Sequence, residues 1–262
     1  MPPPAPKLSA IVITRNEAAN IGRCLDTLAF CDERIVVDCG SSDNTVRLAR
    51  EKGARVVHQD WLGFGAQKNF ALSLAAGDWV LTIDADERVS PPLATAITAA
   101  IATGNADGYE LSRRSSFCGQ EMRHSGWYPD YVLRLFRRGA ARFSEDAVHE
   151  HAVCAGRIAR LEAPLFHEPV LKLEHALSRM DHYSTIGAAQ LVSSGARVSF
   201  ASGLLHGLAA FFKTYVLRAG FLDGRRGLLL AVANAEGAYY KYMKAWVAQS
   251  NAKSRLGGDG PA

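Results

Sequence analysis

Three carboxylates follow directly after an apolar segment in the stretch VLTIDADERVS, Val80 to Ser90. Residues 79–83 are apolar apart from one threonine, and Asp84, Asp86 and Glu87 then follow within four positions. Two aspartates separated by one residue can share a divalent cation, because Mg²⁺ and Mn²⁺ prefer oxygen ligands. Aspartate is also common where strands end in surface turns, since its side chain caps the backbone. The stretch is either a turn or a cation site, and the surrounding sequence has to distinguish the two.

The first ninety residues alternate between strand-like and helix-like segments. Short apolar runs predict strands, and the stretches between them have helical length, one of them closed by Gly53. Such alternation indicates βαβ units and a parallel sheet that is covered on both faces. The predicted strands are residues 8–14, 34–38, 54–59 and 79–84, and the predicted helices are residues 20–29, 44–53 and 65–77.

In a parallel sheet of this kind, ligands bind beyond the carboxyl ends of the strands. The polar residues at those ends are Thr14, Arg15, Asn16, Asp38, Asp84 and Asp86. Because all of them should lie along one edge of the sheet, the acidic cluster is better interpreted as part of a site. The chain has no G-x-x-x-x-G-K-[ST] and no G-x-G-x-x-G after its first strand, which argues against a P-loop or a dinucleotide site.

Composition and charge describe a folded protein with a basic C-terminal part. Hydrophobic residues make up 48% of the 262 residues, enough for a substantial core. Five scattered cysteines without a C-x-x-C pair favour a reducing compartment, and the N-terminal stretch lacks a signal sequence, so we expect a cytoplasmic protein. From Val170 onward 11 Lys and Arg stand against 5 Asp and Glu. This asymmetry predicts an anionic partner, membrane or nucleic acid.

After Pro92 the strand–helix rhythm fades, and helical patterns dominate from Leu171 to Trp246. We therefore expect an α/β domain over residues 1–169, a helical extension over 170–248 and a disordered tail over 249–262. The extension is apolar, aromatic and basic, but its longest charge-free run, residues 198–212, is shorter than a membrane-spanning helix requires.

Helical spacing in the extension favours a helix that lies in a membrane interface. The apolar residues of this stripe are Leu204, Leu208, Phe211 and Tyr215, and the cations close to it are Lys213, Arg218, Arg225 and Arg226. Packing on the catalytic domain or on another subunit is an equally good interpretation. No nucleic-acid-binding motif accompanies the cations, so nucleic acid is not expected as a partner.

Four stretches carry a family resemblance: IVITRNEAANIGRCLDTL, IVVDCGSSDNT, GAQKNFAL and GDWVLTIDADE. In this order they resemble the nucleotide-sugar domain of family 2 glycosyltransferases, closely over residues 8–88 and more loosely as far as His167. Within the family the chain is most similar to bacterial lipopolysaccharide-core β-1,4-glucosyltransferases. The resemblance implies the GT-A fold, a Rossmann-like, mostly parallel α/β sheet flanked by helices, here with a helical C-terminal extension.

The same resemblance implies inverting, metal-dependent transfer of a hexose, glucose from UDP-glucose, to an inner-core sugar of lipopolysaccharide. The lipid-linked acceptor would be met at the cytoplasmic face of the inner membrane. A polyprenyl phosphate or a protein side chain is the alternative acceptor, and a non-catalytic nucleotide-sugar binding protein is the alternative function. A phosphatase with an Asp nucleophile is less consistent, because that Asp usually follows the first strand.

Carried over by position, the resemblance gives each residue of this edge a role. Thr14 and Asn16 contact the donor, Asp38 accepts a hydrogen bond from the base, and Arg15 stands where the family often has tyrosine. Lys68, where the family usually has arginine, lies near the diphosphate. Asp84 contacts ribose and metal, and Asp86 is the principal ligand of Mg²⁺ or Mn²⁺. His167 completes the metal shell.

The catalytic base is expected in FSEDAVHE, with Glu150 preferred and Asp146 in reserve. An inverting transfer needs a carboxylate that takes the proton of the acceptor hydroxyl. Structural alternatives remain open. In these, Asp38 caps its own turn, Asn16 caps the next helix, and the arginines of RLFRR lie on a solvated strand face instead of meeting an anionic acceptor; these arginines are Arg134, Arg137 and Arg138.

Overall fold

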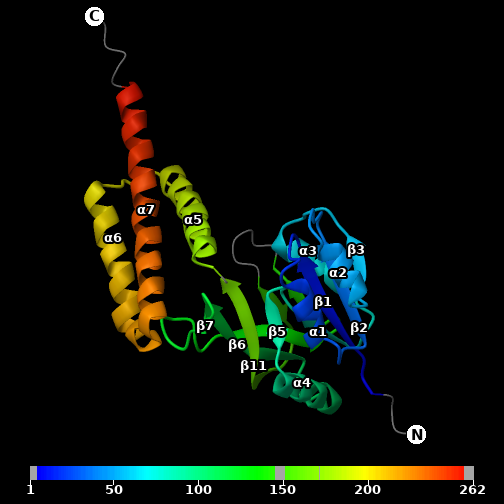
Figure 1. The fold of residues 1–262 in the computed structure, drawn as a ribbon. Coiled ribbons are helices and arrows are strands. Elements are labelled where there is room, and N and C mark those ends of the chain that lie inside the picture. The colour runs from blue at the N-terminus through cyan, green and yellow to red at the C-terminus, as the bar shows by residue number, and fades with distance from the viewer. Residues whose placement is uncertain (1–4, 145–150, 171, 257–262) are drawn as a thin grey trace, which may run out of the picture. The chain divides into compact units, whose positions relative to one another are not determined.

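The first part of the chain forms the parallel sheet that its sequence predicts. In the computed structural model, which describes residues 5–144, 151–170 and 172–256, four strands pair in the order β3-β2-β1-β4. They are β1 (Leu8–Thr14), β2 (Glu33–Asp38), β3 (Arg55–His58) and β4 (Trp79–Thr82). All three pairings are parallel, and Thr14 lies opposite Asp38 in the register. The carboxyl ends of these strands therefore meet at one edge of the sheet (Figure 1).

Three helices connect the parallel strands: α1 (Ile21–Thr27), α2 (Thr45–Glu51) and α3 (Phe64–Ser73). Strands β1, β2 and β4 are buried on both faces, as expected where helices cover a parallel sheet, whereas β3 at the edge of the sheet is partly exposed. Successive residues of β1 contribute to different cores: Ile11 belongs to one cluster and Val12 to the other. This alternation follows from the two-residue repeat of side chains along a strand.

The second part of the sheet contains antiparallel pairs. Strand β8 (Tyr131–Arg137) pairs with β4, and β6 (Gly108–Phe117), β11 (Ile158–Val170) and β5 (Glu87–Val89) follow in that order. The antiparallel pairs are β4 with β8, β8 with β6, and β11 with β5. Helix α4 (Pro91–Thr103) is N-capped by Ser90 and ends at Gly104, whose φ is 61°. Two short strands, β9 (Ala141–Phe143) and β10 (Ala152–Cys154), pair apart from this sheet. The α/β fold class is confirmed, and strands β1–β4 pair in parallel.

The chain divides into two units, which are described separately. The first consists of Met1–Arg114 and Pro129–His167, and the second, the helical unit, of Ser115–Tyr128 and Glu168–Ala262. The helical unit contains α5 (Leu173–Ser193), α6 (Phe200–Phe212), the π-helical turn η1 (Lys213–Leu217), the 3₁₀ turn η2 (Gly220–Asp223) and α7 (Gly224–Leu256). Helix α7 extends into the segment that was expected to form a disordered tail, as far as Leu256.

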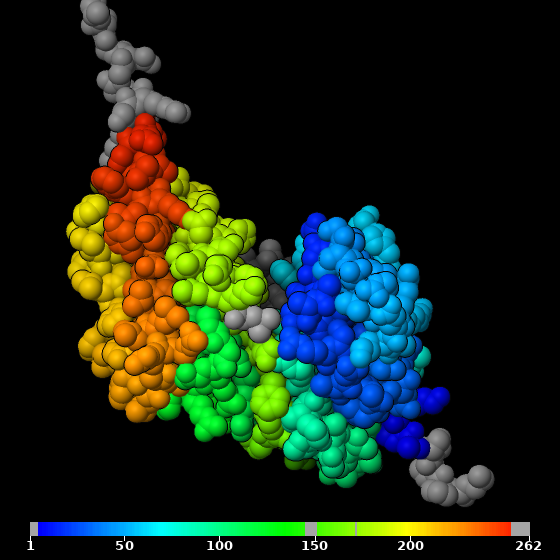
Figure 2. Space-filling view, viewed as in Figure 1, coloured from blue at the N-terminus to red at the C-terminus, as the bar shows by residue number. Residues whose placement is uncertain are grey.

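Helix α7 is the centre of the helical unit and packs against both α5 and α6. Figure 2 shows α6 and α7 side by side along their length. Two glycines allow the close approach of these helices: a Cβ at Gly203 would lie 2.4 Å from Met243 Cε, and one at Gly207 would lie 3.3 Å from the carbonyl oxygen of Ala235. One side of α6 is therefore covered by α7.

The segment Gln120–Ser125 begins with the short strand β7 (Gln120–Glu121), which pairs with β6, and one buried carboxylate joins this segment to the helices. Asp223 accepts hydrogen bonds from the backbone N–H groups of Arg123 (3.0 Å) and His124 (3.1 Å) and from Ser125 Oγ (2.9 Å). Its exposed fraction is 5%. A small apolar core of Phe117, Met122, Val170 and Leu230 lies in the same unit.

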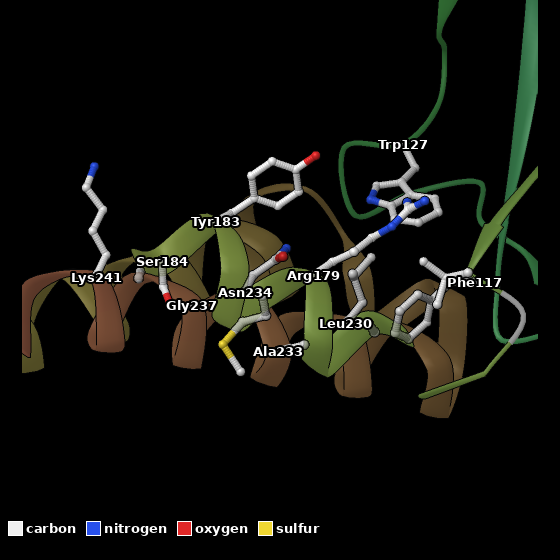
Figure 3. Close-up of a pocket in the computed structure, with 14 residues that line it drawn as sticks. Phe117, Trp127, Arg179, Tyr183, Ser184, Leu230, Ala233, Asn234, Gly237 and Lys241 are labelled. Atoms are coloured by element: carbon white, nitrogen blue, oxygen red, sulfur yellow. The ribbon is translucent and has the colours of Figure 1, made fainter. Parts of the chain in front are cut away.

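A groove of about 470 Å³ opens between α5 and α7, with an apolar floor that includes Phe117 and Leu230. Two cations belong to its lining, and Figure 3 shows Arg179 extending toward Trp127 and Lys241 at the opposite end. Within the residues that the structure describes, neither of these cations pairs with a carboxylate.

Candidate functional site

The acidic cluster forms a hydrogen-bonded turn between β4 and β5. Glu87 donates its backbone N–H to the carbonyl oxygen of Asp84 (2.9 Å), and its carboxylate accepts the backbone N–H of Asp84 (3.0 Å). The side chain of Glu87 is fully buried. The backbone of this stretch therefore forms a turn, as one of the two interpretations predicts. A surface turn alone does not explain why the carboxylate of Glu87 is fully buried.

Cations from two other elements neutralise this turn. Arg134 of β8 donates to the carboxylates of both Asp84 and Glu87, the latter at 2.6 Å. Lys68 of α3 places its Nζ 3.4 Å from Asp84 Oδ1. Arg113 of β6 lies 3.5 Å from Glu87. A buried charge is tolerated when it is paired and hydrogen-bonded, and this turn meets that condition.

The neighbouring cations determine the ionisation of Asp84. Burial alone raises the pKa of a carboxyl group, but Arg134 and Lys68 outweigh burial and hold the pKa of Asp84 well below its usual range. Burial likewise lowers the pKa of Arg134, and Asp84 and Glu87 reverse that effect and raise it. Asp84 and Arg134 therefore both stay charged at neutral pH.

The interpretation of Arg134 as part of a solvated strand face is wrong, because only 6% of this residue is exposed. Two nearby arginines also have partners: Arg137, the last residue of β8, donates to the carbonyl oxygen of Gly104 (2.9 Å), and Arg138, just after β8, donates to that of Gly77 (2.8 Å). Arg134 alone of the three is directed at the acidic turn.

Asp86 and His167 form a second pair at the same turn. Strand β11 pairs with β5 so that His167 lies opposite Glu87, and His167 Nε2 is 3.5 Å from Asp86 Oδ2. Both side chains are mostly buried. No group of three His, Cys, Asp or Glu side chains suited to a metal ion occurs within the described residues, and the role of Asp84 as a third metal ligand stays a prediction. The pair by itself offers one oxygen and one nitrogen ligand.

Asp38 caps the turn that follows β2. Its Oδ2 accepts the backbone N–H groups of Gly40 (3.0 Å) and Ser41 (2.9 Å), and its Oδ1 accepts the Ser41 hydroxyl. Only 3% of Asp38 is exposed. The structural alternative for Asp38 is therefore observed, and binding of a base by this carboxylate stays a prediction.

The residues at the end of β1 contact the turn that follows β2 and include one buried polar atom without a hydrogen-bond partner among the described residues. Asn16 adopts a φ of 56° and accepts the backbone N–H of Ser42 (2.8 Å), so it joins two loops and does not cap the next helix. Arg15 is exposed. The buried hydroxyl of Thr14 has no hydrogen-bond partner in the described part of the chain. A buried polar atom without a partner at a sheet edge is a position where a ligand can bind.

The structure brings together some predicted residues and leaves others outside the description. Asp84 and Lys68 form one contact, Asp86 and His167 another, and Thr14 lies opposite Asp38 in the register. Both candidate bases, Asp146 and Glu150, lie outside the described residues. The ion pair between Arg134 and Glu87 was not predicted from the sequence. Their opposite charges were the one signal for it in the sequence.

A family model for "Glycosyl transferase family 2" matches residues 9–162, which is more than half of the chain. The chain belongs to this family. It is 31% identical over 255 residues to the "Lipopolysaccharide core biosynthesis glycosyltransferase LpsC" of Rhizobium meliloti, an alignment covering 90% of this chain and 93% of that protein. It is also 31% identical over 251 residues to an "Uncharacterized glycosyltransferase" of Rickettsia felis, covering 91% and 89%. The chain is thus a nucleotide-sugar glycosyltransferase.

Solved structures resemble only part of the chain. Glucosyl-3-phosphoglycerate synthase from Mycobacterium tuberculosis, crystallised with Mn²⁺, uridine diphosphate and glucosyl-3-phosphoglycerate, is 28% identical with a TM-score of 0.38. The match covers 42% of this chain and 44% of that chain.

Proposed function

We propose that the protein catalyses inverting, metal-dependent transfer of a hexose, glucose from UDP-glucose, to an inner-core sugar of lipopolysaccharide. The observation that supports this most is the charged turn after β4, where Asp84, Lys68 and Arg134 meet at the carboxyl ends of the parallel strands. Ligands of such sheets bind beyond this edge. In a family 2 glycosyltransferase the ligand is a nucleotide sugar.

The donor side of the proposal uses the polar residues of this edge. The unpartnered hydroxyl of Thr14 is available to a nucleotide, and Arg15 is exposed beside it. Asn16 and Asp38 hold the two loops that frame the edge. Lys68, 7% exposed, supplies a positive charge for the donor diphosphate. Asp84 is held by Lys68 and Arg134, and we assign it to the ribose.

The pair Asp86 and His167 fits a divalent cation. Their ligand atoms are 3.5 Å apart, close enough for both to bind one Mg²⁺ or Mn²⁺, with Asp84 as the further carboxylate. When bound, such a cation stabilises the charge that builds up on a diphosphate leaving group. Asp86 and His167 would hold the ion, and Lys68 and Arg134 would keep Asp84 ionised.

The acceptor half of the reaction needs a base. The acceptor oxygen attacks the anomeric carbon of the hexose, its proton passes to a carboxylate, and the bond to the diphosphate breaks. Configuration is inverted because a single displacement occurs. We assign the base to Glu150, with Asp146 as the alternative.

The assignment of the acceptor draws on relatives and on the helical unit. A relative named for lipopolysaccharide core biosynthesis shares 31% identity along nearly all of both chains. We propose that residues 1–169 bind donor and acceptor and that residues 170–248 form a membrane-associating extension. The protein would then lie at the cytoplasmic face of the inner membrane, where a lipid-linked saccharide is accessible.

The test is a donor panel with purified protein, assayed with Mg²⁺, Mn²⁺ or EDTA for nucleotide release and for transfer. UDP-glucose with a lipid A–core acceptor should be turned over, and EDTA should abolish the reaction. Asp86→Ala should lose several kcal/mol of transition-state stabilisation. Asp60→Ala, which removes an exposed carboxylate, is the matched control.

Three outcomes would contradict parts of this proposal. Activity that survives EDTA or Asp86→Ala would refute the metal assignment. Transfer to polyprenyl phosphate or to a protein, with none to a core saccharide, would refute the acceptor. Tight binding of UDP-glucose without any turnover, with every acceptor tried, would indicate a sensor.

A further inference from the structure

One surface of the helical unit exposes large apolar side chains along α6, η1 and η2, and we call it the α6 face. Four of its leucines are at least 60% exposed: Leu205 (65%), Leu208 (69%), Leu217 (70%) and Leu222 (60%). A single exposed leucine needs no explanation, but a contiguous apolar surface on a soluble protein marks an interaction site.

The opposite side of α6 is already occupied. Gly203 and Gly207 face α7, where they meet Met243 and Tyr239. The window Phe200–Leu217 is long and apolar enough to cross a membrane by its composition, but one side of it packs on α7. Lys213 also interrupts it. These features favour a helix that lies along a surface over one that spans a bilayer.

The charges beside the α6 face have one sign. Between Asp181 and Glu236 the sequence contains five cations, among them Lys213, Arg225 and Arg226, and Asp223 is its one acidic residue. Asp223 is buried, and its carboxylate is occupied by three donors of the loop Arg123–Ser125. The surface of this segment is therefore apolar and positively charged, with its single carboxylate withdrawn from solvent.

This combination identifies the occupant. A second copy of the chain, docked through the same face, would place Lys213, Arg225 and Arg226 opposite like charges with no carboxylate of this segment to pair them. An anionic lipid surface satisfies both properties at once, since acyl chains accept the leucines and headgroups accept the cations. Charge complementarity thus favours lipid.

We propose that the α6 face lies in the interface of an anionic lipid bilayer, with Leu205, Leu208, Leu217 and Leu222 in the acyl region and Lys213, Arg225 and Arg226 among the headgroups. The inference specifies the surface behind the proposed function, which requires access to a lipid-linked acceptor. It assigns the contact to α6, η1, η2 and the start of α7.

The experiment is vesicle flotation of the full chain with phosphatidylcholine alone and with added phosphatidylglycerol. The wild type should bind the anionic vesicles, and high salt should release it. Arg225→Gln/Arg226→Gln should weaken binding about 20- to 30-fold, because a cation near an anionic membrane is worth about fivefold. Leu205→Asp/Leu208→Asp should weaken it about tenfold or more per leucine.

Matched controls change the same residue types elsewhere. Ile158→Asp alters an exposed apolar residue of the first unit, and Arg47→Gln removes an exposed cation of α2; both should bind like the wild type. All four variant proteins are changed at exposed positions, and their circular dichroism should match the wild type. Donor binding by calorimetry should be unchanged throughout.

Several results would overturn the inference. They are wild-type binding that does not depend on anionic lipid, α6-face variants that bind like the controls, or resistance of bound protein to alkaline carbonate, which would indicate a spanning helix. Concentration-dependent dimers in ultracentrifugation, abolished by Leu205→Asp/Leu208→Asp, would assign the face to a second copy.

Transfer to a soluble, deacylated acceptor is measured in parallel. If transfer persists while vesicle binding fails, only the surface assignment is wrong. If vesicle binding holds without transfer, the proposed function is wrong.

Discussion

Replacement of Glu87 by alanine should destabilise the first unit by about 3 kcal/mol. Glu87 is fully buried, accepts from Arg134 at 2.6 Å and accepts the backbone N–H of Asp84 at 3.0 Å. Removal of one partner of a buried ion pair costs roughly 3–5 kcal/mol, because the other charge is left without compensation. Arg134 keeps Asp84 as a partner, so we expect the lower end of this range.

The assay is hydrogen exchange of the amides of β4 and β8, because these strands report on the first unit and a chain of two units need not unfold in one transition. Glu87→Gln keeps an acceptor for the N–H of Asp84 and should cost about half as much. Glu51→Ala is the control, since it removes an ion pair with Arg47 at 2.6 Å whose members are more than half exposed. Its expected cost is below about 0.5 kcal/mol. If Glu87→Ala cost less than about 1 kcal/mol, the charged turn would not depend on this carboxylate.

Three further results are expected. Glu150→Gln should keep the Kd for UDP-glucose measured by calorimetry, and its transfer rate should fall by about 10²–10⁴-fold. If Asp146→Asn were inactive and Glu150→Gln active, Asp146 would be the base. Asp223→Ala leaves the part-buried backbone N–H groups of Arg123 and His124 and the buried hydroxyl of Ser125 without this acceptor, so thermal unfolding followed by circular dichroism should show a loss of roughly 2–5 kcal/mol; an unchanged Tm would contradict this. Burial raises the pKa of Cys31 to about 12, so its thiolate appears only near that pH and iodoacetamide labelling of the native protein should stay slow between pH 7 and 9. Labelling in urea, where the thiol regains its ordinary pKa, should be fast, and equal rates in both states would refute the burial.

The parallel half of the fold could be predicted from local pattern. Apolar runs such as the one from Leu8 to Thr14 are buried on both faces, and the connections have helical length, so the gathering of Thr14, Asp38 and Asp84 at one edge follows from the sequence. Helix boundaries differ by a few residues: α1 covers Ile21–Thr27 where residues 20–29 were expected. Such differences are usual at helix ends.

The partners of the acidic turn could not be predicted, because they depend on long-range pairing. Arg134 reaches Asp84 only because β8 pairs antiparallel with β4, and nothing in the local sequence specifies that pairing. Asp38 shows the opposite difficulty: its position at a strand end indicated a ligand, but the backbone donors of its own turn occupy its carboxylate.

The prediction that the apolar stripe of the extension is exposed was only partly correct. Leu204 and Leu208 are exposed as expected, but Phe211 and Tyr215 are half-buried, and Leu205 is more exposed than Leu204. Helix α6 is apolar around most of its circumference, so periodicity alone does not decide which side faces α7. The glycines at 203 and 207 carry that information, since only small residues permit the approach seen there.

The helical unit is assembled from two separated pieces of chain, and this has a consequence for synthesis on the ribosome. Phe117 and Met122 leave the ribosome about 100 residues before Asp223 and Leu230. The contacts of Asp223 and Leu230 stabilise the segment that contains Phe117 and Met122. At 5–20 residues per second, this interval lasts roughly 5–20 s. During that time the segment Ser115–Tyr128 has apolar side chains and no helices to bury them. A nascent chain stalled between residues 130 and 220 should therefore be a substrate for chaperones, and expression of residues 1–169 alone would leave the same segment permanently exposed.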